Sequence, residues 1–344
     1  MSTWVVVLAG GVGSRFWPLS TPARPKQLLS LVGDKALLEE SVARLRPLVE
    51  PMRVLILTNS SLRGAVRKLL PEVPADNVIA EPRAGGTAAA LTWGAQEITR
   101  REGPDAVMIS VHADWAVGDA AGFVATLREA AVVAAEHKAL VTVGVVPSRP
   151  DPGFGYIEPG EEMATGVRRV ATFVEKPDRE RAARLIARGA LWNSGIFVWR
   201  VGDFLDDVRR HTPEIAPALH AHADDIEGFF RDVTPVSVDH GVLERSDRVV
   251  VMPGDFAWDD VGTWGALRRV RAQDAAGNAV SGKTYAVAAR GNVVHSEGPT
   301  VVLYGVEDLV VVAQDGLVLV TTVDKSSELK TLIDALPPGV VDRS

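Results

Sequence analysis

The chain has 344 residues, no cysteine and a formal net charge of −7 at pH 7. The lack of cysteine excludes disulfides, thiolate metal sites and cysteine nucleophiles, and the negative charge argues against general nucleic-acid binding. No apolar run reaches the roughly 18 residues of a membrane span, and no charged leader precedes an apolar segment. We therefore expect a soluble, cytoplasmic protein that does not associate with membranes.

Short apolar runs alternate with helical patterns through most of the chain. Because the length exceeds a usual domain of ~100–200 residues, we expect one large domain and one smaller one. The alternation predicts an α/β fold with a mostly parallel sheet covered on both faces. The expected strands are 4–9, 53–58, 77–79, 106–111, 140–146, 155–157, 167–175, 195–200 and 249–253, and the expected helices are 37–45, 62–70, 88–101, 120–137, 179–188, 201–211 and 216–229.

The pattern changes near residue 277. Five short β-rich runs follow one another at regular spacing, punctuated by Gly, Asn, Asp and Glu, before a last helical pattern at 326–336. Regular short strands without intervening helices indicate a small β-rich unit. We therefore divide the chain into residues 1–276 and residues 277–344.

The first expected strand leads into a glycine-rich turn that could bind phosphate. Gly10, Gly11 and Gly13 let backbone N–H groups approach a ligand closely, and such groups form a concavity that suits an anion. Arg15 and Lys26 follow in the same loop. A tight turn with solvated charges explains these residues equally well, because neither the GxxxxGK[ST] loop nor the full GxGxxG loop is present.

Two acidic segments are candidates for holding Mg²⁺. Asp114 follows the strand at 106–111, and Asp259 and Asp260 lie in FAWDDVGTW. Carboxylate oxygens from distant strand ends suit Mg²⁺, which takes one or two carboxylates in addition to substrate phosphates. Asp114 could instead be a helix cap or a turn residue.

Two further segments place polar residues at strand ends. Glu175 and Lys176 lie in FVEKP, where Pro177 ends the strand, and Asn193 lies in a polar turn that opens the next one. A carboxylate and an amide suit sugar hydroxyls and an ammonium suits a phosphate, although a solvated charge pair and a local turn are the simpler explanations. The histidines lack zinc spacing and no serine lies in a GxSxG elbow, so zinc and serine hydrolase chemistry have no support.

Several strings together resemble one enzyme family. LAGGVGSRFWPLS with PKQ, then FVEKP and WNSG, are similar to signatures of the sugar-1-phosphate nucleotidylyltransferases, and WPLS and PKQ are most similar to the mannose-1-phosphate guanylyltransferase branch. The resemblance covers nearly the whole chain. It implies a Rossmann-like nucleotidyltransferase domain followed by a short left-handed β-helix. Because such β-helices often serve association, a homodimer is an expectation.

The resemblance also implies site residues. Asp114 and Asp260 would hold Mg²⁺, with Asp259 at a variable position. Arg15, Lys26 and Lys176 would be catalytic. Base recognition is expected from EPRAGGTAAA, where Glu81 could accept from guanine. The nucleotide would be bound by Leu8, Ala9, Gly10, Gly11, Gly13, Ser14, Arg15, Glu81, Gly86 and Thr87, and the sugar phosphate by Gly155, Tyr156, Glu175, Lys176 and Asn193.

The implied reaction converts GTP and mannose 1-phosphate into GDP-mannose and pyrophosphate with Mg²⁺. The sequence departs from the family pattern in two segments. Gly85 and Gly86 stand where Arg-Asn is usual, and His112 and Trp115 replace the proline and histidine of a PADH string. Two alternatives therefore stay open: another sugar 1-phosphate or nucleoside triphosphate, or a catalytically silent regulatory relative.

Overall fold

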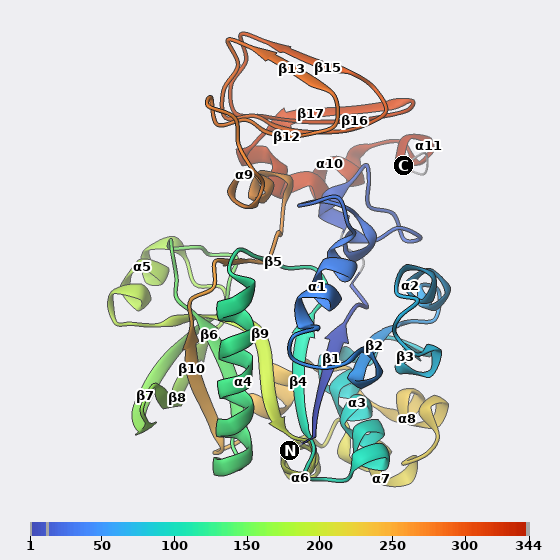
Figure 1. Ribbon diagram of the computed structural model, residues 1–344, viewed down its shortest axis with the longest axis vertical. Coiled ribbons are helices and arrows are strands. Elements are labelled where there is room, and N and C mark those ends of the chain that lie inside the picture. Colours follow the sequence, from blue (N-terminus) through green and yellow to red (C-terminus); the bar gives the residue numbers. More distant parts are fainter. Residues whose placement is uncertain (1, 12–13, 342–344) are drawn as a thin grey trace. The chain divides into compact units, whose positions relative to one another are not determined.

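The computed structural model describes residues 2–11 and 14–341, and Figure 1 shows their path. The chain forms two compact units. The first comprises residues 1–10, 42–113 and 119–258, and the second comprises 11–41, 114–118 and 259–344. The predicted boundary near residue 276 falls within the second unit, and the two-domain assignment stays a prediction. No helix among the described residues is long and apolar enough to cross a membrane.

A nine-stranded sheet forms the centre of the first unit, in the order β3-β2-β1-β4-β9-β6-β10-β8-β7. Its strands are β1 (Thr3–Leu8), β2 (Val54–Asn59), β3 (Val78–Glu81), β4 (Val107–His112), β6 (Leu140–Val145), β7 (Tyr156–Ala164), β8 (Val167–Val174), β9 (Leu191–Arg200) and β10 (Val249–Gly254). The pairings make β8 and β9 antiparallel to the other strands. The prediction of a mostly parallel sheet is confirmed, with these two reversals.

Helices cover both faces of the sheet, and its strands are therefore buried on both sides. Val5, Val6 and Val7 are all fully buried, and alternate side chains of a strand point to opposite faces. One face packs against α3 (Gly86–Glu102) and α6 (Val201–His211), while α4 (Ala120–His137) contacts β4, β6 and β9, as Figure 1 shows. The other helices of this unit are α2 (Arg63–Leu69), α5 (Arg179–Ala187), α7 (Ala216–Ala221) and α8 (Ile226–Asp232), and α1 (Leu37–Leu45) crosses the division between the units.

Two sequence predictions differ from the structure. The single helix expected at 216–229 is two short helices, α7 and α8, separated at the His-Ala-Asp-Asp segment that begins at His222. The turn expected at Asn193 is instead an irregularity inside β9. Gly195 has φ +73°, and the register of β9 against β6 shifts near this point. This irregularity is a bulge, which redirects neighbouring side chains.

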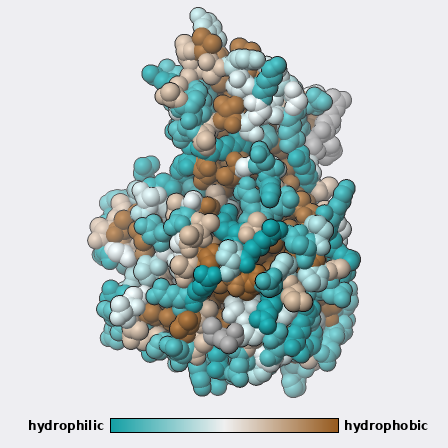
Figure 2. All heavy atoms as spheres, viewed as in Figure 1, coloured by the Kyte–Doolittle hydropathy of each residue, from teal (hydrophilic) through white to brown (hydrophobic). Residues whose placement is uncertain are grey.

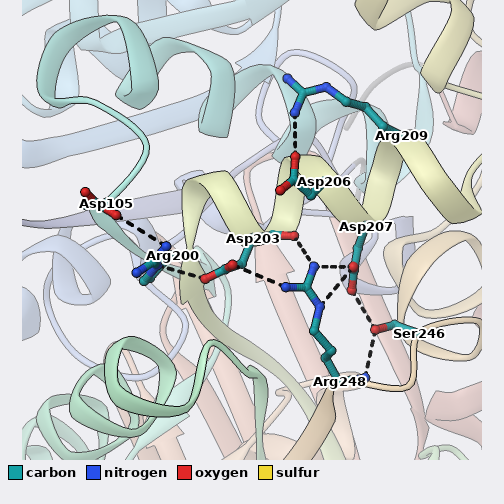
Figure 3. A network of polar contacts seen from close by, with 8 residues as sticks. All are labelled: Asp105, Arg200, Asp203, Asp206, Asp207, Arg209, Ser246 and Arg248. Carbon is teal, nitrogen blue, oxygen red and sulfur yellow. Dashed lines mark hydrogen bonds and ion pairs between the residues drawn. The ribbon is translucent and has the colours of Figure 1, made fainter.

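A buried ion network holds α6 against the start of β10, as Figure 3 shows. Arg248 pairs with Asp207 and, at 3.2 Å, with Asp203. The Asp207 side chain is only 2% exposed and also accepts from Ser246 Oγ at 2.6 Å. Because a carboxylate in such a place needs a partner, Arg248 is a structural residue of this unit.

The second unit has its own apolar core. Phe16, Trp17, Leu29 and Trp264 are buried together there, and Trp264 Nε1 donates to the Trp17 carbonyl at 3.0 Å. The regular elements of this unit and its borders are β5 (Ala116–Val117), β11 (Trp258–Asp259), α9 (Leu267–Val270), β12 (Ala279–Ser281), β13 (Thr284–Val287), β14 (Val293–Glu297), β15 (Val301–Tyr304), β16 (Leu309–Gln314), β17 (Leu317–Thr322), α10 (Leu329–Ala335) and α11 (Pro338–Val341).

The C-terminal strands form successive coils. β12, β14 and β16 pair in parallel, and so do β13 and β15, so the predicted β-rich, β-helix-like unit is confirmed. Inside the coils, Asn292 Nδ2 donates to Asn278 Oδ1 at 2.9 Å, and Asn292 Oδ1 accepts from the Leu309 amide at 3.0 Å. On the outside, Tyr285, Val287, Val302 and Tyr304 are exposed. Figure 2 shows hydrophobic residues interspersed with hydrophilic ones on the visible face of this region.

Candidate active site

In the second unit, Lys26 lies between the two proposed metal-binding aspartates. Its Nζ donates to Asp114 Oδ2 at 2.9 Å and to the Asp260 carbonyl at 2.6 Å. Lys26 begins the short 3₁₀ turn η2 (Lys26–Leu28) directly after Pro25, and its side chain is only 8% exposed. Asp260 lies in a tight turn in which its Oδ1 accepts from Gly262 N and Val261 has φ +48°. The sequence-predicted residues Lys26, Asp114 and Asp260 are therefore brought together.

A cation bound near the Asp260 carboxyl would stabilise its ionised form. Burial raises its pKa, the Lys26 ammonium opposes that rise, and the charges of Asp259 and Asp114 add to it. A desolvated carboxylate beside other acids is stabilised when positive charge is brought close. Within the part of the chain that the structure describes, no cluster of three or more candidate ligand side chains occurs. Two aspartates fit Mg²⁺ only when substrate oxygens complete its coordination.

Asp259 has a different role from Asp260. Its side chain accepts from Arg269 Nε at 2.8 Å and from the Val261 amide at 2.9 Å, and it is 6% exposed. Because this carboxylate is already compensated by an arginine, we interpret it as a residue that shapes the turn. It is the weaker metal candidate of the pair.

The glycine turn is only partly described. Val12 and Gly13 lie outside the described residues, as does the side chain of Ser14. Gln27 Nε2 donates to the Gly11 carbonyl at 3.0 Å. The 3₁₀ turn η1 (Ser14–Phe16) exposes Arg15, while its neighbour Phe16 is fully buried against Trp264 with ring centroids 5.1 Å apart. Arg15 is thus an exposed cation next to a firmly packed residue.

In the first unit, four predicted sugar-binding residues line one cavity of about 340 Å³. They are Gly155, Tyr156, Glu175 and Asn193. The backbone N–H of Asn193 donates to the Gly155 carbonyl at 2.8 Å. A Cβ on Gly155 would lie 2.9 Å from Glu175 Oε2. Glycine at 155 therefore lets the backbone approach the carboxylate closely.

Two of the predicted residues have contacts within the protein: that of Tyr156 was not indicated by the sequence, and that of Lys176 is the charge pair that the sequence offered as its simpler explanation. The hydroxyl of Tyr156 accepts from the Asp151 amide at 2.9 Å, and the side chain is buried, so its polar end holds a loop. Lys176 is exposed, has φ +41° and pairs with Glu175 Oε1 at 2.6 Å. The ammonium group therefore lies beside a residue that lines the cavity.

Aromatic side chains support the strands that carry this cavity. Phe154 packs edge-on against Trp192 at 4.8 Å and contacts Trp258 at 5.4 Å. The Arg149 guanidinium lies 5.0 Å from the Trp192 ring. Because Phe154 precedes Gly155 and Trp192 precedes Asn193, this packing fixes the backbone on two sides of the cavity.

The cavity also has lining residues that the sequence did not predict. Two are apolar, Phe173 and Val174, and the others are Ser237, Asp239, His240 and Glu244. The last three belong to or border η5 (Asp239–Leu243), a π-helical turn. Acidic residues in a loop gave no local signal of a site. Only the folded chain brings them to Asn193.

Glu81, the candidate for base recognition, ends β3 in a partly buried position. Burial raises its pKa from the usual 4.5 to about 7, and a hydrogen bond from the Gly85 amide opposes the rise. A Cβ built on Gly10 would lie 3.7 Å from Glu81 Oε1, so the end of β1 and the end of β3 lie close together. A carboxyl group and glycine backbone are thus adjacent at these strand ends, and the base-recognition role of Glu81 stays a prediction.

The remaining predicted nucleotide-binding residues have structural partners. Gly86 has φ +81°, and a Cβ there would lie 2.3 Å from the Val236 carbonyl oxygen. Thr87 Oγ1 accepts from the Val238 amide at 2.9 Å. Leu8 and Ala9 use backbone groups in hydrogen bonds at the end of β1. These contacts explain the residue types by packing, and their nucleotide-binding role stays a prediction.

Comparisons with known proteins agree on one family. A family model described as "Nucleotidyl transferase" matches residues 4–277. A mannose-1-phosphate guanylyltransferase of Escherichia coli is 36% identical over 96% of this chain and 73% of its own length. The alginate biosynthesis protein AlgA of Pseudomonas aeruginosa is 33% identical over 96% of this chain and 71% of its own. A crystal structure from Thermus thermophilus, described as a mannose-1-phosphate geranyltransferase, is 33% identical with a TM-score of 0.89, covering 97% of this chain and 99% of that one.

Proposed function

Because the chain belongs to the nucleotidyl transferase family and is an enzyme of the sugar-phosphate nucleotidyltransferase type, we propose that it transfers GMP from GTP to mannose 1-phosphate. The products are GDP-mannose and pyrophosphate. The observation that carries this proposal is the cavity of Gly155, Glu175 and Asn193. Carboxylate and amide groups around a cavity of about 340 Å³ suit the hydroxyls of one sugar ring.

The reaction needs positioning and charge neutralisation. A phosphate oxygen of the sugar 1-phosphate forms a bond to the α-phosphorus of GTP, while the bond from that phosphorus to the bridging oxygen breaks and pyrophosphate leaves. No covalent enzyme intermediate is required, since proximity and electrostatic stabilisation suffice for such a displacement. Mg²⁺ held by Asp114 and Asp260 would supply positive charge to the phosphates.

We assign each cation a role that its surroundings support. Lys26 is nearly buried beside two acids, which suits it to balance phosphate charge near the α-phosphate. Arg15 is exposed and suits the mobile triphosphate tail, because guanidinium binds phosphate oxygens in pairs. Lys176, next to Glu175, suits the phosphate of the incoming sugar.

Glu81 is proposed to select guanine. Guanine presents N–H donors on the edge where its N1 and N2 atoms lie, and a carboxylate accepts from both. The raised pKa of Glu81, about 7, means that a base with two donors also stabilises the ionised form. Gly85 and Gly86 leave backbone rather than side chains at this place.

A pyrophosphate-release assay tests the proposal. The purified protein is supplied with Mg²⁺, each of the four common nucleoside triphosphates, and a panel of mannose, glucose, galactose and glucosamine 1-phosphates. GTP with mannose 1-phosphate should give the highest kcat/KM. Faster turnover of another pair would replace the substrates proposed here, and no turnover with any pair would favour a silent regulatory relative.

A further inference from the structure

Asp239 reaches the proposed sugar cavity from the start of the π-helical turn η5. Its Oδ1 accepts from Asn193 Nδ2 at 2.8 Å, and both residues line the cavity with Gly155 and Glu175. The contact joins residues 46 positions apart in the chain. A side chain that bonds to one cavity residue while lining the cavity itself has two ways to influence a ligand.

The first way is to fix the orientation of the Asn193 amide. Asn193 Oδ1 accepts from the Gly195 amide at 3.2 Å, and its Nδ2 donates to Asp239. With one partner on each end, the amide cannot rotate by half a turn without losing both bonds. One N–H of Asn193 and one oxygen of Asp239 then stay as an adjacent donor and acceptor, the pattern that neighbouring hydroxyls of a sugar ring require.

The second way is direct contact between the Asp239 carboxylate and a ligand, which requires that Asp239 itself be held in place. The Val238 amide donates to Thr87 Oγ1 at 2.9 Å, and Val236 packs so closely on Gly86 that no side chain would fit there. The segment that leads into Asp239 is therefore clamped to the beginning of α3. Such support keeps a recognition group in place before the ligand arrives, which lowers the cost of binding.

Charge around the cavity points to a neutral, hydroxyl-rich ring. Three carboxylates, those of Glu175, Asp239 and Glu244, are among its lining residues. Glu244 Oε1 forms a hydrogen bond with His240 Nδ1 at 2.8 Å. The pKa of His240 is raised by that bond, with further contributions from Asp239 and Glu175. Acceptors outnumber donors in this set, which suits groups that donate hydrogen bonds.

We propose that Asp239 is a recognition residue for the sugar: one carboxylate oxygen orients Asn193 and the other accepts a hydrogen bond from a ring hydroxyl. This rests on the proposed function, because it assumes that the cavity holds the sugar 1-phosphate. It adds a second acidic contact to the one expected from Glu175. The FVEKP and WNSG strings alone gave no sign of it.

Two variants separate the two roles of Asp239. Asp239→Ala removes both contacts, so the KM for the sugar 1-phosphate should rise about 10- to 100-fold, the usual range for losing hydrogen bonds to a charged group. Asp239→Asn keeps an oxygen for Asn193 but replaces the other acceptor with a donor, so a smaller rise, of about 3- to 10-fold, is expected. The KM for the nucleotide should stay within about twofold of the wild-type value in both variants, because neither contact involves the predicted nucleotide-binding residues.

The matched control is Asp206→Asn, which changes an exposed aspartate of α6 whose partner is Arg209. Its kinetics should match those of the wild type. All proteins are measured with the sugar 1-phosphate that the wild-type enzyme uses best. An unchanged KM for that sugar in both Asp239 variants, or an equal rise for sugar and nucleotide, overturns the inference while leaving the proposed function intact.

If Asp239→Ala does not fold, Asp239→Asn alone decides the question by the same split between the two KM values. A wild-type protein that turns over no sugar 1-phosphate of the panel would overturn both the proposed function and this inference. The two failures are therefore distinguishable.

Discussion

Glu81 should make the stability of the protein fall as pH rises through the weakly acidic range. Its pKa is raised from 4.5 to about 7 in the folded chain because the carboxyl is largely buried. As pH increases above 4.5, the unfolded chain loses this proton first while the folded chain keeps it until about pH 7. Unfolding then releases a proton, so stability decreases with rising pH over that window and levels off above it.

The magnitude follows from the gap between the two pKa values. One pKa unit corresponds to about 1.4 kcal/mol, so the shift of Glu81 from 4.5 to about 7 has a full effect of at most about 3.5 kcal/mol. Since Glu81 is partly exposed, we expect about 2 kcal/mol between pH 5 and pH 8. Glu81→Gln keeps an acceptor for the Gly85 amide and cannot ionise. The free energy of unfolding of this variant should therefore lack that decrease.

Urea unfolding at pH 5, 6, 7 and 8, followed by tryptophan fluorescence, measures the difference between the two proteins at each pH. The advantage of Glu81→Gln should grow up to pH 7 and then stay constant. Glu129→Gln, an exposed glutamate of α4, serves as the control and should run parallel to the wild type. Parallel curves for Glu81→Gln as well would refute the burial argument.

Three further substitutions test other parts of the site and the fold. Arg15→Ala should lower kcat about 10²- to 10³-fold with an unchanged Tm, because the side chain is exposed; a lower Tm with normal turnover would contradict the phosphate role. Asp260→Asn should abolish Mg²⁺-dependent turnover, and near-normal activity would exclude Asp260 as a ligand. The Tm at pH 8 should not fall, because burial raises the pKa of Asp260 and the ionised carboxylate that the variant removes is therefore unfavourable in the folded chain. Arg248→Met should destabilise the protein by about 2–3 kcal/mol, because it leaves Asp207 without its cation, whereas Arg209→Met, at an exposed pair, should change the free energy of unfolding by less than about 0.5 kcal/mol in urea titrations.

The sequence predicted what is local. The buried runs of β1, β2, β4, β6 and β10 contain β-branched and aliphatic residues that have few alternatives to a covered sheet. The residues of FVEKP and WNSG are each contiguous, so a motif could place them on strand ends before their partners were known. Gly155, Glu175 and Asn193 accordingly meet in one cavity.

What depended on pairing between distant segments was not predictable. No local pattern indicates that β8 and β9 run against the other strands. The contact of Asp239 with Asn193 likewise depends on where the π-helical turn is anchored. Asp259 and Asp260 are adjacent and have the same side chain, and only the resemblance favoured Asp260 as the metal ligand. The physical reason why Asp259 is the weaker candidate, its pairing with Arg269, depends on the folded chain.

The stacked asparagines of the C-terminal coils limit how this region can change in length. Asn278 and Asn292 occupy equivalent places in successive coils, each filling the bend with side-chain hydrogen bonds to the next layer. A deletion or insertion of one residue would move an asparagine out of step with its neighbour and leave buried amides without partners. Gain or loss of an entire coil would preserve the stack, so this part of the chain can evolve in whole layers more readily than residue by residue.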